Sequence, residues 1–445
     1  MTISISVEQA SQAAPDDNSL KAAKKLCAPQ KWNQLSRDEQ TIWGQIQGSS
    51  TYDSAIYLDV MQFKCTCPSF KRPCKHSLAL LMCYAQSADC FSEQVLSGKA
   101  LEWRDKMGEA AVKKAEKQAE KAAKPVDEAA RQKRIAAREK KVEQGLEELG
   151  RWLQDLAKMG LAQARNQGHQ LFGSIESRLV DAQATGLANL INALHSTLYQ
   201  PDWTLRAAQL TGRLALIVQM WQQRAQLPAD VLTELRQLIG FNVSVDDVLA
   251  TPPMTGHWWV IGSQERETIQ GNGRYRRQWL WHSQLNQTAL LLDFAFGPMG
   301  QFSVGQPVGS QVDAKLHFYP SACPQRALIS DAKWLQQADL STLQTIGYAD
   351  FNEALQAQAQ ALAQNPLQTS LPWLVHQVCL QYEADQLWLC DQHGHAVRAS
   401  PISGSVSHWQ VLALSGNQPV TIAGEWDGQS LDLLTLWQGE DILCL

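Results

Sequence analysis

Four side chains that can bind a metal lie within twelve residues of one another in the first quarter of the chain. Cys65 and Cys67 form a Cys-x-Cys pair, and after six residues Cys74 and His76 form a Cys-x-His pair. Three thiolates and one imidazole are a ligand set of closed, four-coordinate structural zinc sites. Prolines just inside the two pairs suit the sharp bends that such close ligands require. The spacing therefore predicts one structural Zn²⁺ bound by these four residues.

The segment that holds the four ligands is basic. Lys71, Arg72 and Lys75 lie on or beside the ligand loop, Lys64 precedes it, and no Asp or Glu occurs between positions 61 and 87. Cations near thiols are expected to lower the thiol pKa values and to offset the negative charge of a zinc–thiolate site. Two interpretations stay open. The basic residues serve the metal site alone, or they bind an acidic partner surface or a phosphate.

The elements that must position the ligands are short. Residues 52–60 are rich in strand-forming side chains, residues 63–65 predict a second strand, and apolar residues recur at helical spacing after Lys75. The prediction is a ββα unit, with short helices upstream over residues 19–47. A hairpin and one helix are too small to be stable alone, so metal binding should supply much of the local folding free energy.

This stretch resembles the bacterial branch of the SWIM-type zinc finger proteins, through the pattern Cys-x-Cys-x6-Cys-x-His. The resemblance implies a ββα fold, one bound zinc, and a role in DNA binding or protein interaction. It also implies MoxR-type AAA ATPases and von Willebrand factor A proteins as partners. The close resemblance covers roughly residues 20–103. The residues that carry it are Phe63–Ser69, Arg72–Leu81 and Trp43–Ser49, with looser similarity at Val180–Gln183 and Phe318–Ser321.

The composition is that of a multi-domain globular protein. The chain has 445 residues, 44% of them hydrophobic, and a net charge of -5. No apolar run reaches the length of a membrane helix, and residues 1–10 lack the pattern of a signal peptide, so we expect a cytoplasmic protein. In that setting the ten cysteines are expected to be free thiols or metal ligands and not a disulfide framework.

Charge and periodicity divide the chain into five parts. Residues 104–141 carry 13 Lys and Arg against 7 Asp and Glu, whereas residues 255–445 carry 8 against 16. The predicted fold class is multi-domain α+β, with a small ββα zinc finger, a charged helical linker, a helical bundle and a C-terminal β-rich module with a helical insertion. The predicted parts are a disordered arm (1–18), the SWIM zinc-finger domain (19–103), the charged helical linker (104–141), the helical region (142–254) and the β-rich module (255–445).

Other chemically active patterns are weaker. The stretch 390–395, with one Cys, one Asp and two His, is interpreted as a turn between strands, and the basic-aromatic stretch 274–282 as a strand whose Trp279 and Trp281 face a core. Cys83 and Cys90 are interpreted as free thiols. The chain lacks a phosphate-binding Gly-rich loop, a His-Glu-x-x-His motif and a Gly-x-Ser-x-Gly motif, so we predict that it is not an enzyme.

Two functions remain. In the first, the chain is a protein-interaction adaptor that works through the finger and the C-terminal module. In the second, it binds nucleic acid, DNA above all, through the finger and the basic linker. The acidic C-terminal half would repel a phosphate backbone, which favours the adaptor. The sequence does not identify the partner.

Overall fold

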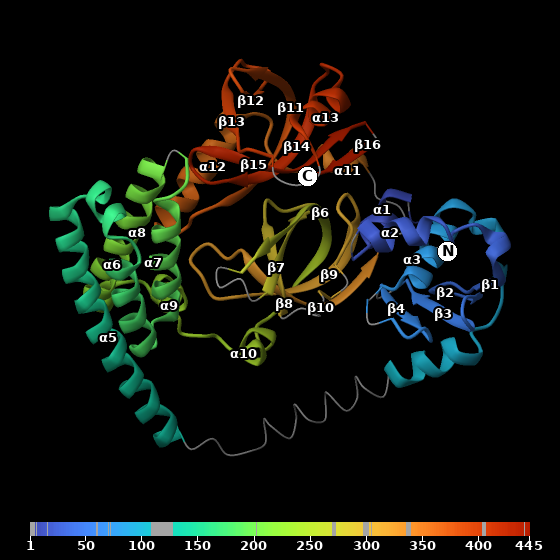
Figure 1. The fold of residues 1–445 in the computed structure, drawn as a ribbon, viewed down its shortest axis with the longest axis horizontal. Helices are drawn as coiled ribbons and strands as arrows, with labels where there is room; N and C mark the ends of the chain where they lie inside the picture. The colour runs from blue at the N-terminus through green and yellow to red at the C-terminus, as the bar shows by residue number, and fades with distance from the viewer. Residues whose placement is uncertain are drawn as a thin grey trace.

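The computed structural model is of the mixed α+β class. A finger domain and a helical bundle lie on opposite sides of a closed barrel, and a final sheet covers the barrel (Figure 1). No helix among the described residues is both long and apolar enough to span a membrane. The structure describes residues 5, 7–15, 17–58, 61–69, 71, 73–107, 128–201, 203–268, 273–296, 302, 303, 305–334, 340–402, 406–439 and 441–445.

The finger domain is a five-stranded sheet with helices on it. The strand order is β4-β3-β2-β1-β5, antiparallel except for the β1–β5 pair. Its strands are β1 (Trp32–Arg37), β2 (Thr41–Gln47), β3 (Thr51–Tyr57), β4 (Gln62–Cys65) and β5 (Ser92–Glu93). Its helices are α1 (Val7–Gln12), α2 (Asp17–Lys24) and α3 (Lys75–Gln86), residues 98–107 are also helical, and short 3-10 turns lie at Pro29–Lys31 and Ala88–Cys90.

The upstream part of this domain differs from the prediction. Residues 32–37 and 41–47 form strands where short helices were expected, and the prediction of helix is wrong there. In β2, Ile42 and Ile46 face the core beneath α3, whereas Trp43 faces a second cluster that includes Ala100. A strand that is buried on both faces shows no alternation of polar and apolar residues, so its period is hidden in the sequence.

The N-terminal segment also differs from the expected disordered arm. Residues 7–12 form α1, and Ala10 is fully buried in the finger core, where α1 packs against α3. The Ser- and Gln-rich composition hid this helix because only a small part of its surface is apolar.

Five helices, joined by short turns, form the bundle in the described part of the chain. They are α5 (Glu128–Met159), α6 (Leu161–Asp181), α7 (Thr185–Thr197), α8 (Trp203–Gln222) and α9 (Ala229–Ile239), and the short α10 (Val245–Leu249) follows. Residues 108–127 of the predicted charged linker lie outside the described residues. Residues 128–141 are the first part of α5, so the expected boundary at position 142 falls inside a helix.

The C-terminal region contains two β structures around one core. The closed barrel has the order β10-β8-β7-β6-β9, and the final six-stranded sheet has the order β13-β12-β11-β14-β15-β16. The barrel strands are β6 (Met254–Glu267), β7 (Gly273–His282), β8 (Thr288–Phe296), β9 (Gln311–Phe318) and β10 (Arg326–Trp334). The sheet strands are β11 (Leu371–Glu383), β12 (Gln386–Cys390), β13 (Ala396–Ala399), β14 (Val420–Trp426), β15 (Ser430–Gln438) and β16 (Asp441–Cys444).

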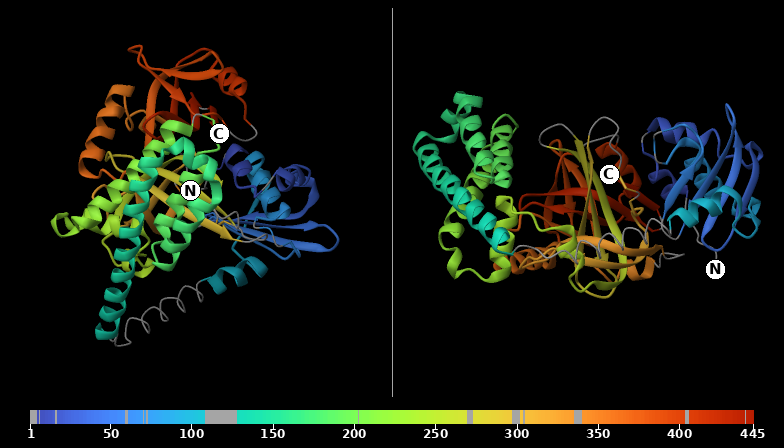
Figure 2. Two further views of the ribbon diagram at one scale, coloured as in Figure 1. Left: turned by 60° about the vertical axis from the view of Figure 1, so that its left-hand side comes forward. Right: turned by 90° about the horizontal axis from the view of Figure 1, so that it is seen from below.

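Helices α11 (Leu340–Leu343) and α12 (Phe351–Gln364) form the expected insertion between barrel and sheet, and α13 (His408–Ser415) lies on the sheet. Trp279 and Trp281 are fully buried, as are Trp258 and Trp259, and one hydrophobic core joins the barrel to the final sheet. The two β structures therefore pack as one body, with the bundle and the finger on opposite sides of it (Figure 2).

Candidate metal centre

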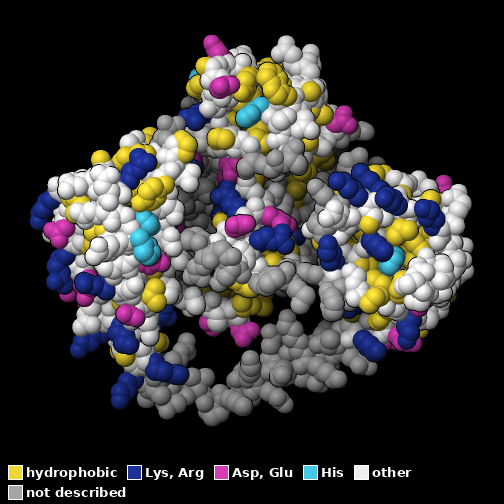
Figure 3. Space-filling view, viewed as in Figure 1, with side chains coloured by type: hydrophobic (Ala, Val, Ile, Leu, Met, Phe, Trp, Pro, Cys, Tyr) yellow, Lys and Arg dark blue, Asp and Glu magenta, His cyan; other side chains and the backbone are white. Residues whose placement is uncertain are grey.

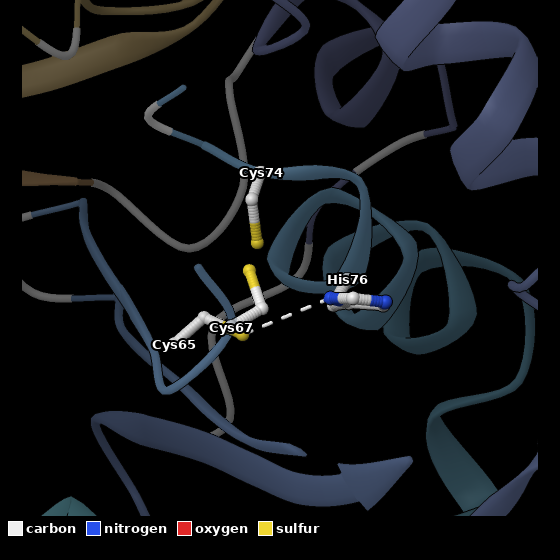
Figure 4. Close-up of side chains that lie close together, drawn as sticks. All are labelled: Cys65, Cys67, Cys74 and His76. Atoms are coloured by element: carbon white, nitrogen blue, oxygen red, sulfur yellow. Dashed lines mark hydrogen bonds between the residues drawn. The ribbon is translucent and has the colours of Figure 1, made fainter. Parts of the chain in front are cut away.

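The four predicted ligands converge at one edge of the finger sheet. Cys65 ends β4, Cys67 follows after one intervening residue, and Cys74 and His76 lie at the start of α3. Their ligand atoms all lie within 4.8 Å of one another, and Cys65 Sγ is 3.9 Å from His76 Nδ1 (Figure 4). The strand and the helix thus bring the two halves of the motif together.

The bend between the first two ligands is held by the neighbouring strand. Thr66 donates its backbone N–H to the Asp53 carbonyl oxygen (3.0 Å), and its Oγ1 accepts the Asp53 backbone N–H (2.9 Å). This reciprocal pair continues the β3–β4 ladder past Cys65. Because two hydrogen bonds to Asp53 hold Thr66 in place, Cys65 and Cys67 can face the same point although only one residue separates them.

The second pair of ligands uses the N-terminus of α3. Cys74 is the N-cap residue, and its Sγ accepts the backbone N–H of Ser77 at 3.5 Å. The positive end of a helix dipole stabilises a thiolate at this position. His76, in the first turn, stacks on Tyr52 with the ring centroids 5.0 Å apart. Figure 4 shows its Nδ1 directed toward the sulfurs, so β3 fixes the orientation of the imidazole.

The cluster fits one structural zinc ion. In a tetrahedral site with Zn–S bonds of about 2.3 Å the sulfurs lie about 3.8 Å apart, which is compatible with the observed separations. All four side chains are buried, with Cys74 fully inaccessible. Four protein ligands fill the coordination shell, so a bound zinc ion would stabilise the fold of this loop and would not activate a water molecule.

The three thiols affect one another's protonation in the metal-free cluster. The hydrogen bond to Cys74 and burial raise the pKa of Cys65, and burial raises the pKa of Cys67. The hydrogen bond from Cys65 lowers the pKa of Cys74 to about 3. The expectation that nearby cations lower the thiol pKa values is not met for Cys65 and Cys67, because burial and the hydrogen bond between the thiols have the larger effect. A dication would displace the protons of Cys65 and Cys67, so that all three sulfurs could bind it as thiolates.

Comparison with known families gives the same assignment. A family model for the SWIM zinc finger matches residues 49–85, which span β3, β4 and α3 with all four ligands. The chain contains a SWIM zinc finger. A second model, for the SWIM-associated four-helix bundle domain, matches residues 137–239, which lie within α5–α9. Comparison with curated proteins and with solved structures found no match.

Two of the predicted basic residues lie at the surface beside the metal cluster. Lys71 and Lys75 are exposed and line a hollow of about 570 Å³ next to the metal cluster, together with Tyr52 and Pro68. Arg72, predicted with them, lies outside the described residues. The sequence analysis did not identify Tyr52 and Thr66 as site residues. The sequence offers a weak signal for each: Tyr52 lies in the strand before β4, and Thr66 lies between two ligands.

The weaker candidate at positions 390–395 forms the turn between β12 and β13. The buried carboxylate of Asp391 accepts the backbone N–H groups of His393 and His395 and lies 3.0 Å from His395 Nδ1. These contacts stabilise the turn. In the part of the chain that the structure describes, no group of three or more metal ligands converges apart from the SWIM cluster.

Proposed function

We propose that this chain is a non-enzymatic protein-interaction adaptor whose SWIM finger recognises an acidic surface on a partner. The observation that carries the proposal is the lysine-lined hollow beside a closed metal site. By resemblance, the partner belongs to the MoxR-type AAA ATPases or the von Willebrand factor A proteins.

The closed ligand set supports a role in recognition. An ion with four protein ligands cannot bind substrate, so its contribution is the rigidity of the loop between Cys67 and Cys74. Lys71 is on that loop and Lys75 follows it. A rigid basic loop loses little conformational entropy on binding, which raises its affinity for a complementary surface.

The size and lining of the hollow favour a protein over a duplex. The hollow combines the two ammonium groups with Tyr52, Pro68 and Ala22, so it offers apolar contact as well as charge. A carboxylate on an apolar surface has this complementary character. A duplex needs a row of phosphate contacts over a longer distance.

Nucleic-acid binding is the second candidate, and a different surface favours it. Lys21, Lys24 and Lys25 are exposed at the end of α2, and Figure 3 shows Lys and Arg side chains gathered on the visible face of the finger domain. The basic residues 108–127, which would extend such a surface, lie outside the described residues.

Two matched double variants separate the candidates. Native pull-down with mass spectrometry and anisotropy with duplex DNA would both be run on the wild type, on Lys71→Ala with Lys75→Ala, and on Lys21→Ala with Lys24→Ala. The adaptor proposal expects loss of a specific ATPase or von Willebrand factor A partner in the first variant only. It is wrong if both variants keep the same partners, or if the first variant loses only DNA affinity.

A further inference from the structure

A large cavity lies where the four parts of the molecule meet. It has a volume of about 1280 Å³ and is lined by the finger, the bundle, the barrel and the final sheet. We call it the arginine cleft, because six arginines and no lysine occur among its lining residues. They are Arg206, Arg266, Arg274, Arg276, Arg277 and Arg398. Figure 3 shows basic and acidic side chains gathered in the central hollow between the finger and the bundle.

Positive charge is concentrated here against the trend of the region. Residues 255–445 contain 8 Lys and Arg in all, of which five line this cleft, although the region has 16 Asp and Glu. Four carboxylates share the lining: Glu265, Glu425, Asp427 and Asp432. The cleft is therefore a basic site in an acidic module. Its guanidinium groups can bind a carboxylate through two hydrogen bonds, which a lysine cannot do.

The six arginines differ in burial and in ion pairing. Arg276 and Arg277 are mostly buried, and Arg277 binds Glu425 through two hydrogen bonds of 2.8 and 2.9 Å. Arg206 and Arg274 are about half exposed or more, and each contacts one acidic side chain, Asp427 at 3.5 Å or Glu265 at 3.0 Å. Arg266 is also partly exposed and pairs with Asp432 at 2.5 Å.

Arg398 is exposed and has no ion pair with the described part of the chain. Exposed ion pairs contribute little to stability, so a carboxylate from another molecule can replace the internal partner of Arg206 or Arg274. The buried pairs hold the walls, and the exposed arginines are available to a ligand.

We propose that the arginine cleft binds an extended acidic segment of a partner protein, whose carboxylates contact Arg206, Arg274 and Arg398. This inference specifies what the proposed adaptor binds. It rests on the adaptor proposal in one respect, namely that the segment belongs to a partner protein. Five prolines line the cleft and provide rigid apolar contact between the charges: Pro15, Pro73, Pro201, Pro307 and Pro401.

The lining favours a peptide over single-stranded nucleic acid. The aromatic side chain among the described lining residues is Phe302, and the guanidinium carbons of Arg274 and Arg276 lie 5.2 and 5.1 Å from its ring centroid. This single ring already contacts two guanidinium groups, and it does not form the series of aromatic platforms on which successive bases stack. The four carboxylates would also repel a strand that carries a phosphate at every nucleotide, whereas a peptide can place neutral or basic residues beside them.

The test uses the full chain and fluorescein-labelled probes in anisotropy titrations at low salt. The probes are a peptide of alternating Glu and Ala, the same peptide with Gln for Glu, and single-stranded oligothymidylate of equal charge. We expect the Glu peptide to bind and the Gln peptide not to bind. Arg274→Ala with Arg398→Ala should weaken Glu-peptide binding about tenfold, since each exposed contact contributes a factor of about three.

Two comparisons make the result decisive. Lys315→Ala with Lys333→Ala removes equal charge from the barrel outside the cleft and should leave the affinity unchanged. Arg274→Lys with Arg398→Lys keeps the charge but not the planar donor geometry. It should retain the fold and still weaken binding, and it replaces the alanine variant should that variant unfold.

Any one of three results overturns the proposal. The Glu peptide does not bind, or Lys315→Ala with Lys333→Ala weakens its binding as much as Arg274→Ala with Arg398→Ala does. The third is that oligothymidylate binds in preference to the peptide and depends on the cleft. Lys71→Ala with Lys75→Ala should not change Glu-peptide binding. A failure of the finger proposal therefore stays separate from a failure of this one.

Discussion

Replacing Cys74 by serine isolates the contribution of the metal. Cys74 supplies one of four ligand atoms, and it also caps α3 by accepting the Ser77 backbone N–H. Serine is among the preferred N-cap residues, so Cys74→Ser keeps the cap and removes the thiolate. Structural zinc contributes about 10–16 kcal/mol in small fingers at neutral pH. Shared equally among four ligands, this is about 3 kcal/mol for Cys74, or about two powers of ten in zinc affinity.

The structure limits how far the damage should spread. β3 pairs with β2 along its whole length, from Thr41↔Tyr57 to Gln47↔Thr51, and the core beneath the sheet includes residues far from the cluster, such as Trp32. The sheet therefore does not depend on the metal alone, as a free-standing hairpin and helix would. We expect loss of order in residues 62–78 with β1, β2 and β3 still folded.

Zinc content measured by mass spectrometry under reducing conditions, chelator competition and hydrogen exchange test this expectation together. The wild type should hold one zinc per chain. The variant should release zinc at a chelator concentration about a hundredfold lower than the wild type requires. It should lose amide protection only around the ligand loop. Cys90→Ser, at an exposed cysteine outside the cluster, is the control. Wild-type zinc affinity in Cys74→Ser, or a zinc-free wild type, would refute the reasoning.

Three further predictions concern stability. Burial raises the pKa of the Cys83 thiol to about 12. The stability that the buried thiol contributes is therefore complete below its ordinary pKa of about 8.5 and is lost as the pH rises toward 12. In Cys83→Ala, alkaline unfolding followed by circular dichroism should be less steep. Gly186→Ala would place a Cβ 2.0 Å from a backbone oxygen of α9 and should destabilise the bundle by about 1–3 kcal/mol. At Gly212 an added Cβ meets nothing within 4 Å, so Gly212→Ala should stabilise the bundle by up to about 1 kcal/mol. Thermal melts measure both changes. Glu425→Ala leaves the buried Arg277 without its partner and should cost about 3–5 kcal/mol in urea unfolding.

Local patterns in the sequence predicted the metal centre well, because its ligands are close in the chain. Cys65 and Cys67 are held by a hairpin, and Cys74 and His76 by the first turn of one helix, so only the six-residue loop between the two pairs must close. The buried Trp279 was predicted for a similar reason, since its position in a short strand is visible in the sequence.

Long-range features were not predictable in this way. Strand β2 hides its period because both of its faces are buried. Closure of the barrel depends on a short parallel pairing of β8 with β10, at Leu290 and Leu291, and no local pattern encodes that contact. The pairing of Arg206 with Asp427 likewise joins residues that are more than two hundred positions apart.

The composite lining of the arginine cleft has a practical consequence for anyone who studies this protein in pieces. Pro73, next to a SWIM ligand, Arg206 on the bundle, Arg274 on the barrel and Arg398 on the final sheet are separated by long stretches of sequence, yet they border one cavity. A fragment that separates the finger, the bundle and the joined barrel and sheet from one another would lose part of the wall. Truncation mapping would then report several inactive fragments and no single responsible domain, so point substitutions in the intact chain are the informative route.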